Sequence, residues 1–146
     1  MKRLIYIFIL ASLELFINIH KSFAQVANEN AFTGSENISW VIYFDCNNYT
    51  IKSEFNSSID SHAQFLIRYP RSRVSIVGHD DGQNSSREFS LSLGHLRAAS
   101  VKNALLSKGV SPTQFEVISF GSVKPAVAGN DKIESAKNCR VEIFDK

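Results

Sequence analysis

Proline, methionine, tryptophan and cysteine are scarce in this chain of 146 residues, which holds three prolines, one methionine, one tryptophan and two cysteines. Two cysteines are too few for a disulfide scaffold, and Cys46 and Cys139 lack the C-x2-C spacing of a zinc site. A hydrophobic fraction of 44% excludes wholesale disorder, and a charged fraction of 21% excludes a coiled-coil rod. The sequence therefore predicts one small globular domain whose core must stabilise itself.

The chain also lacks a surplus of one charge. Of 16 basic and 14 acidic residues, Lys2, Arg3, Lys21 and Glu14 lie in the first 24 positions, which leaves 13 of each sign in the rest. Nonspecific nucleic-acid binding needs excess cations that displace counterions from phosphates, and a polybasic membrane contact needs them too. We expect neither partner.

The N-terminal segment has the pattern of a secretory signal peptide. Lys2 and Arg3 precede an apolar run, and Ser22 and Ala24 occupy the −3 and −1 positions of a cleavage site, so residues 1–24 are expected to be removed. The alternative is an uncleaved anchor, although the apolar run is shorter than the roughly 20 residues that span a bilayer. No cysteine precedes Cys46, so we expect no lipobox and no lipid anchor. Residues 25–37 are polar and predict a flexible lead-in.

Hydrophobic periodicity then predicts an alternation of strands and helices. Apolar, β-branched runs predict strands, spacings of three and four predict helices, and Tyr69-Pro70 and Lys108-Gly109 are expected to end the two helices. The expected strands span 40–44, 73–78, 115–120 and 140–144, and the expected helices run from Ser53 to Tyr69 and from near Leu91 to Lys108. The segment 121–138 has no regular pattern. This β-α-β-α-β-β order predicts an α+β, two-layer α/β sandwich, with two helices on one face of a mixed four-stranded sheet.

A series of short motifs follows these elements in order. They are Tyr43-Phe44-Asp45, Phe55 with His62-Ala63, Gly78-His79-x-Asp81, Leu93-Gly94 with Arg97-Ala98, Lys108-Gly109-Val110, Lys124-Pro125-Ala126 and Lys137-Asn138 with Arg140. In this order the chain resembles the OmpA-like C-terminal domain family and, within it, the peptidoglycan-associated lipoprotein (Pal) branch. The resemblance covers about 41–144, so the domain is expected to span 38–146.

The resemblance implies a noncatalytic domain that binds peptidoglycan through the diaminopimelate of its stem peptide. That amino-acid head group needs a guanidinium for its carboxylate and an acid for its ammonium, and the family motif assigns these roles to Arg97 and Asp81. A helix that starts near Leu91, with Ser90 or Ser92 as N-cap, would place Arg97 in its first two turns, where the helix dipole favours an anion. The plainer alternative is a surface salt bridge.

The loop between the second expected strand (73–78) and the second expected helix departs from the family pattern. Its length differs from the usual spacing between the aspartate and the arginine, and Asp80 is an alternative to Asp81 as the acid; counting from Gly78 favours Asp81. Ser90 stands where many relatives have asparagine. Asp45 and Asn47 lie beside the strand end that helps to form the family's pocket, and Arg140 matches the arginine that the family retains near its last strand. Each has a plain alternative as a turn residue or a solvated charge.

The two cysteines stand where relatives commonly have other residues. Cys46 follows the first predicted strand and Cys139 precedes the last, and the predicted periplasmic location is oxidising, which suggests a Cys46–Cys139 disulfide. The alternative is two buried thiols.

Three functions follow from these residues. The first is a periplasmic, peptidoglycan- or outer-membrane-associated module that binds the cell wall and stabilises the envelope. The second is a degenerate domain that acts as an adaptor for Tol-type or other envelope proteins. The third is an enzyme built on His79, Asp80 and Asp81, which is poorly supported because no nucleophile motif or second ligand set accompanies them. We expect no catalysis, no cofactor and no metal.

Overall fold

The computed structural model describes residues 40–83, 86–129 and 131–146. The predicted signal peptide (1–24) and lead-in (25–37) lie outside the described residues. The strands are β1 (Trp40–Tyr43), β2 (Val74–His79), β3 (Phe115–Gly121) and β4 (Arg140–Asp145), and the helices are α2 (Asn56–Arg68), α3 (Arg87–Ser107) and α4 (Lys132–Asn138), with 3-10 turns η1 (Ser53–Phe55) and η2 (Pro112–Gln114). No helix in this described part is long and apolar enough to cross a membrane.

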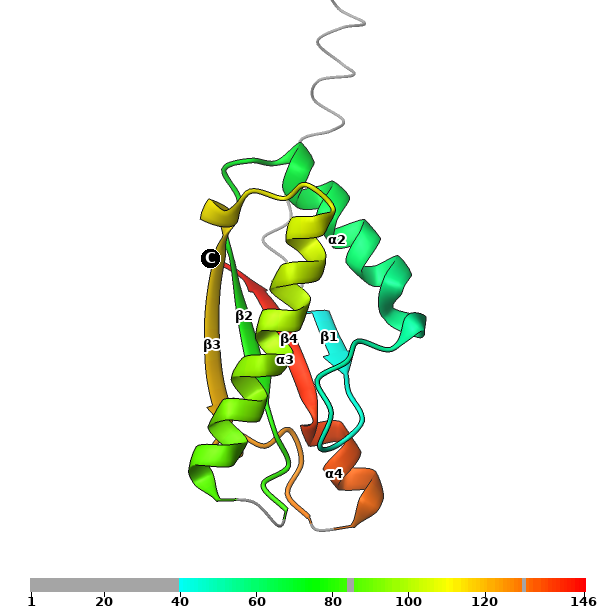
Figure 1. Cartoon of the computed structure of the whole chain (residues 1–146), viewed down its shortest axis with the longest axis vertical. Helices are drawn as coiled ribbons and strands as arrows, with labels where there is room; N and C mark the ends of the chain where they lie inside the picture. Colours follow the sequence, from blue (N-terminus) through cyan, green and yellow to red (C-terminus); the bar gives the residue numbers. More distant parts are fainter. Residues whose placement is uncertain (1–39, 84–85, 130) are drawn as a thin grey trace, which may run out of the picture. The chain divides into compact units, whose positions relative to one another are not determined.

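The four strands form one mixed sheet in the order β1-β4-β2-β3. The last strand, β4, is inserted between β1 and β2 and runs antiparallel to both, whereas β2 and β3 are parallel (Figure 1). Parallel neighbours need a crossover connection, and α3 supplies it. The predicted mixed sheet is therefore confirmed.

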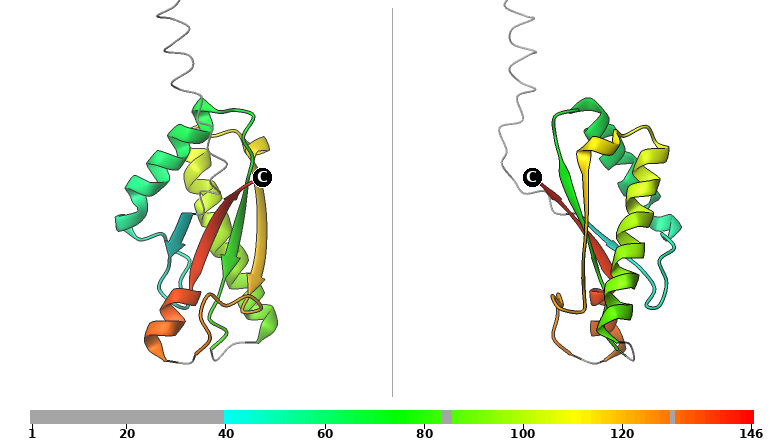
Figure 2. Two further views of the ribbon diagram at one scale, coloured as in Figure 1. Left: turned by 180° about the vertical axis from the view of Figure 1, so that it is seen from behind. Right: turned by 60° about the vertical axis from the view of Figure 1, so that its left-hand side comes forward.

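Helices α2 and α3 cover one face of this sheet, as Figure 2 shows from the side. Alternate strand residues point toward them, because successive side chains in a strand face opposite sides. The sheet contributes Ile42, Ile76, Val141 and Ile143 to the core, and the helices contribute Ile59, Leu66, Val101 and Leu105. This is the predicted two-layer α/β sandwich.

Three features differ from the prediction. Helix α3 begins at Arg87 rather than near Leu91, and its N-cap is Ser86, whose Oγ accepts a hydrogen bond from the Phe89 amide at 3.2 Å. The segment 121–138, predicted to be irregular, contains the seven-residue helix α4. Helix α2 begins at Asn56, three residues after the predicted start, because Ser53–Phe55 form the turn η1. The remaining bounds lie within one or two residues of the predicted ones.

Several chain segments that are distant in sequence meet at one end of the domain. The loop that leaves β1, the β2–α3 loop and α4 all lie at the lower end in Figure 1. The loops there contain most of the side chains that the sequence assigned to ligand binding.

Candidate functional site

Helix α3 lies unusually close to β2 where two glycines meet. A Cβ atom added to Gly78 would lie 1.8 Å from the carbonyl oxygen of Gly94, so both positions need the absence of a side chain. Arg97 follows Gly94 by three residues and therefore projects from the same face of the helix. This contact brings Arg97 against the chain that leaves β2.

The guanidinium of Arg97 is fully buried and is held entirely by protein groups. Its Nη1 donates to the His79 carbonyl at 2.7 Å and to Asp80 Oδ1 at 3.0 Å. Its Nε donates to the Asn48 carbonyl at 2.8 Å, and its Nη2 to the Asp45 carbonyl at 3.4 Å. Arg97 therefore connects the loop after β1 to the loop after β2.

Asp80 is the acid that pairs with Arg97, and it is buried to the same degree, with 2% of its surface exposed. Burial lowers the pKa of Arg97, and the Asp80 carboxylate opposes that shift. The other Asp80 oxygen, Oδ2, accepts a hydrogen bond from the Gly82 amide at 3.3 Å. The ion pair thus fixes the backbone on both sides of Asp81.

The expected position of Arg97 near the helix N-terminus is wrong. Because α3 starts at Arg87, Arg97 lies about three turns into the helix, where the free amide groups of the first turn are out of reach. The helix dipole therefore gives no support to an anion at this side chain.

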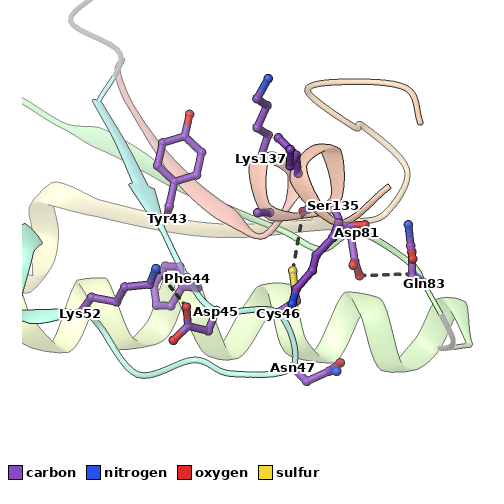
Figure 3. A pocket seen from close by; sticks show the side chains of 13 residues that line it. Tyr43, Phe44, Asp45, Cys46, Asn47, Lys52, Asp81, Gln83, Ser135 and Lys137 are labelled. Carbon is purple, nitrogen blue, oxygen red and sulfur yellow. Dashed lines mark hydrogen bonds and ion pairs between the residues drawn. The ribbon is translucent and has the colours of Figure 1, made fainter. Parts of the chain in front are cut away.

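The buried pair of Arg97 and Asp80 is called the clamp below. An open pocket of about 1070 Å³ lies beside it (Figure 3). One wall is the end of β1 and the loop after it, from Tyr43 to Asn47, and another is the β2–α3 loop with Asp81 and Gln83. The third wall is α4, with residues between Lys132 and Lys137. The three walls come from segments that no local sequence pattern connects.

The pocket separates the predicted site residues into two groups. Asp81, Asp45 and Asn47 belong to its lining, whereas Asp80, Arg97 and Arg140 are not among the described residues that line it. Arg140 opens β4 with 5% of its surface exposed, and its Nε donates to Glu142 Oε1 at 2.6 Å. The predicted partners Arg97 and Asp81 are therefore in different places: one inside the clamp and one on the wall of the pocket.

The pocket contains charges of both signs. Asp81 Oδ1 accepts a hydrogen bond from the Gln83 amide at 3.2 Å, which fixes the turn that presents its carboxylate. Asp45 Oδ1 is 3.0 Å from Lys52 Nζ, and the hydrogen bond to this carboxylate raises the pKa of Lys52. Lys132 and Lys137 bring further cations from α4. Such a lining suits a ligand that carries both an ammonium and a carboxylate.

The lysines of α4 were missed because the helix itself was missed. Its signal was present as a capping box, in which a residue with a short polar side chain is followed three positions later by glutamate. Asp131 Oδ1 accepts from the amides of Ile133 and Glu134 at 2.8 Å each, and Glu134 Oε2 accepts from the Asp131 amide at 3.5 Å. The sequence Asp131-x-x-Glu134 was enough to predict a helix start.

A disulfide joins Cys46 to Cys139 at the pocket. The two sulfur atoms and a carboxylate oxygen of Asp81 all lie within 4.8 Å of one another. In the oxidised state these sulfurs offer no thiolate to a metal ion, so this cluster is a covalent crosslink beside an acid.

Known proteins resemble this chain in sequence. Residues 43–139 match the model of the OmpA family. The chain is 37% identical over 99 residues to a peptidoglycan-associated lipoprotein of Pasteurella multocida, which covers 68% of this chain and 65% of that protein. It is 39% identical over 95 residues to the protein of the same name from Legionella pneumophila, which covers 65% of this chain and 53% of that protein. The chain thus spans between half and two thirds of these relatives.

Solved structures share the fold. The crystal structure of the peptidoglycan-associated lipoprotein from Burkholderia pseudomallei superposes with a TM-score of 0.71 at 32% identity, covering 73% of this chain and 89% of that one. The C-terminal domain of Helicobacter pylori MotB superposes with a TM-score of 0.66 at 26% identity, covering 73% of this chain and 84% of that one.

Proposed function

Because this chain belongs to the OmpA family, we propose that it binds peptidoglycan noncovalently in the bacterial periplasm, as a wall-associated component of the cell envelope that performs no catalysis. The observation that carries the proposal is the position of Asp81. This acid ends the Gly78-His79-x-Asp81 motif and lies on the wall of a pocket that also holds the lysines of α4.

The ligand group that fits this pocket is the diaminopimelate of a stem peptide. Its side-chain head group carries an ammonium and a carboxylate on one carbon. We assign the ligand's ammonium to the Asp81 carboxylate and its carboxylate to a lysine of α4, Lys132 or Lys137, because all three residues line the pocket. Asp45 and Asn47, on the wall formed by the loop after β1, supply further acceptors and donors.

Arg97 has a different role in this proposal from the direct grip that the family motif implies. Its side chain has no exposed surface, and its donors are directed at three carbonyl groups and at Asp80. We assign Arg97 and Asp80 as positioning residues, which hold the loop after β1 and the loop with Asp81 at a fixed separation. Arg140 acts within the sheet, through its pair with Glu142.

Cosedimentation with purified diaminopimelate-type sacculi tests the proposal. We expect the parent chain to sediment with sacculi and free diaminopimelate to compete. Asp81→Asn keeps the shape of the side chain and removes its charge, so binding is expected to weaken about tenfold or more, which is the effect of one charge-assisted hydrogen bond. Asp60→Asn is the matched control, because Asp60 lies on α2 and pairs with Lys108 outside the pocket.

Two results contradict the proposal. A parent chain that does not bind sacculi removes the function, and binding that is unchanged in Asp81→Asn removes the assigned site. Release of soluble muropeptides during the incubation shows catalysis and replaces binding with hydrolysis as the function.

A further inference from the structure

The Cys46–Cys139 disulfide connects two walls of the pocket. It is not needed to join β1 to β4, because these strands are already paired by hydrogen bonds. Tyr43 lies opposite Arg140, and the Phe44 amide donates to the Cys139 carbonyl at 2.8 Å. Cys46 lies beyond that pairing, in the loop that contains Asp45 and Asn47, and Cys139 is the C-cap of α4. The bond therefore fixes the loop after β1 to the end of α4.

Helix α4 has little else to hold it in place. It has seven residues, fewer than the roughly 12–15 that an isolated helix needs in water. Its two buried residues, Ser135 and Asn138, are both polar, and Ile133 is 72% exposed, so no apolar side chain of the helix is buried. Polar contacts remain, chiefly the Asn138 amide group, whose Oδ1 accepts from Ala126 and whose Nδ2 donates to Val127.

The crosslink also lies against the third wall. The Asp81 carboxylate is within 4.8 Å of both sulfur atoms, so the sulfurs occupy the place where the acid, the loop and the helix meet. Cys139 is fully buried and Cys46 partly so. Removal of the bond would release α4 from the loop after β1, which Arg97 still holds through the Asp45 and Asn48 carbonyls. One of the three walls around the group that is assigned to the ligand's ammonium would then be free.

We propose that the Cys46–Cys139 disulfide is a positioning element of the ligand pocket: it holds α4 against the Asp45–Asn47 loop and Asp81, and reduction loosens α4 while the helix–sheet core stays folded. The consequence for ligand affinity rests on the proposed peptidoglycan binding. Reduction by an added dithiol takes two electrons and two protons to convert the S–S bond into two thiols, and the dithiol becomes a cyclic disulfide.

Hydrogen exchange tests the positioning role without any ligand. The full chain is compared in its oxidised form, after reduction by dithiothreitol in the folded state, and as the double variant Cys46→Ala with Cys139→Ala. We expect the amides of 131–139 to exchange faster, at least about tenfold, and those of β2 and the middle of α3 to keep their protection. Exchange in α4 that is unchanged by both treatments overturns the proposal.

A destabilised control separates local loosening from a general loss of stability. Leu105→Ala removes a fully buried core side chain of α3 far along the helix from the pocket loops, and it should lower protection throughout the domain. If the double variant shows the same global pattern as Leu105→Ala, the disulfide is a general stabiliser and the proposal is wrong. Because reduction of the parent needs no substitution, the result does not depend on whether the double variant folds.

Sacculus binding then measures the functional consequence. If the oxidised parent binds, we expect the reduced chain to bind about tenfold more weakly, since the ligand would have to order α4 again. Equal binding in the two redox states overturns the link to the ligand. If the oxidised parent does not bind, the proposed function fails, and hydrogen exchange alone decides whether the disulfide positions the walls.

Discussion

The helix–sheet interface and the pocket end of this domain are held together by different interactions. In the interface the fully buried side chains are apolar, such as Ile76, Val101 and Leu105. At the pocket end they include Arg97 and Asp80, and a disulfide lies beside them. Apolar packing is nondirectional and tolerates adjustment, whereas a buried ion pair depends on the partner and its geometry. The pocket end should therefore respond more sharply to loss of a single polar group.

The largest expected effect comes from breaking the buried clamp. Arg97→Leu keeps an apolar side chain in the helix but leaves the Asp80 carboxylate buried without its cation, together with three carbonyl groups that lose their donor. We expect a loss of about 3–5 kcal/mol in the free energy of unfolding, measured by urea denaturation.

Asp81→Asn provides the contrast, because that side chain faces the pocket and its main-chain turn is kept. It should bind ligand less well at nearly unchanged stability. A small change in stability for Arg97→Leu would contradict the clamp and restore the view of Arg97 as a group free to meet the ligand.

The difference between the apolar helix–sheet interface and the polar pocket end explains which parts of the molecule the sequence could predict. The strands and α2 follow from apolar periodicity, because the interface is built from it. The start of α3 was missed since Arg87 and Glu88 are exposed and add no apolar signal, and α4 was missed since none of its buried residues is apolar.

The identity of the clamp could not be read from the sequence for another reason. Asp80 and Asp81 are adjacent, and in extended chain adjacent side chains point to opposite sides. The motif selected Asp81, which faces the pocket, whereas the acid that pairs with Arg97 is Asp80. Which aspartate points inward depends on the direction in which the chain leaves β2 beneath α3. That direction is set by the packing of the helix on the sheet, which the sequence alone does not show.

An effect of intermediate size is expected from pH, and it compares the two regions directly. Burial lowers the pKa of His62, on the buried face of α2, to about 3, and burial together with nearby Arg140 lowers the pKa of His79, at the end of β2, to about 4. The unfolded chain protonates these groups near 6.5, so between that pH and about 4 it binds more protons than the folded chain. Stability is therefore expected to fall as pH falls, by up to roughly 1.4 kcal/mol per pH unit for each histidine.

Single substitutions show how much each region contributes to the dependence of the unfolding free energy on pH. His79→Gln and His62→Gln each remove one titrating group, so each should flatten the dependence of unfolding free energy on pH between about 4 and 6.5. Equal slopes in both variants and the parent would show that carboxylates, rather than the buried histidines, govern acid unfolding.

The smallest effect should be confined to the pocket end. Asp131 caps α4 through its side-chain bonds to the amides of Ile133 and Glu134, and such a cap contributes about 1 kcal/mol to its helix. Because α4 buries no apolar side chain, its loss should not propagate to the core. We expect Asp131→Ala to speed amide exchange in α4 and to weaken sacculus binding a few-fold, while the urea midpoint stays within error. Asp131→Asn, which keeps the cap, should restore both. A lowered urea midpoint in Asp131→Ala would mean that the two regions unfold as one cooperative unit. The stability of α4 could then not be changed without changing that of the core.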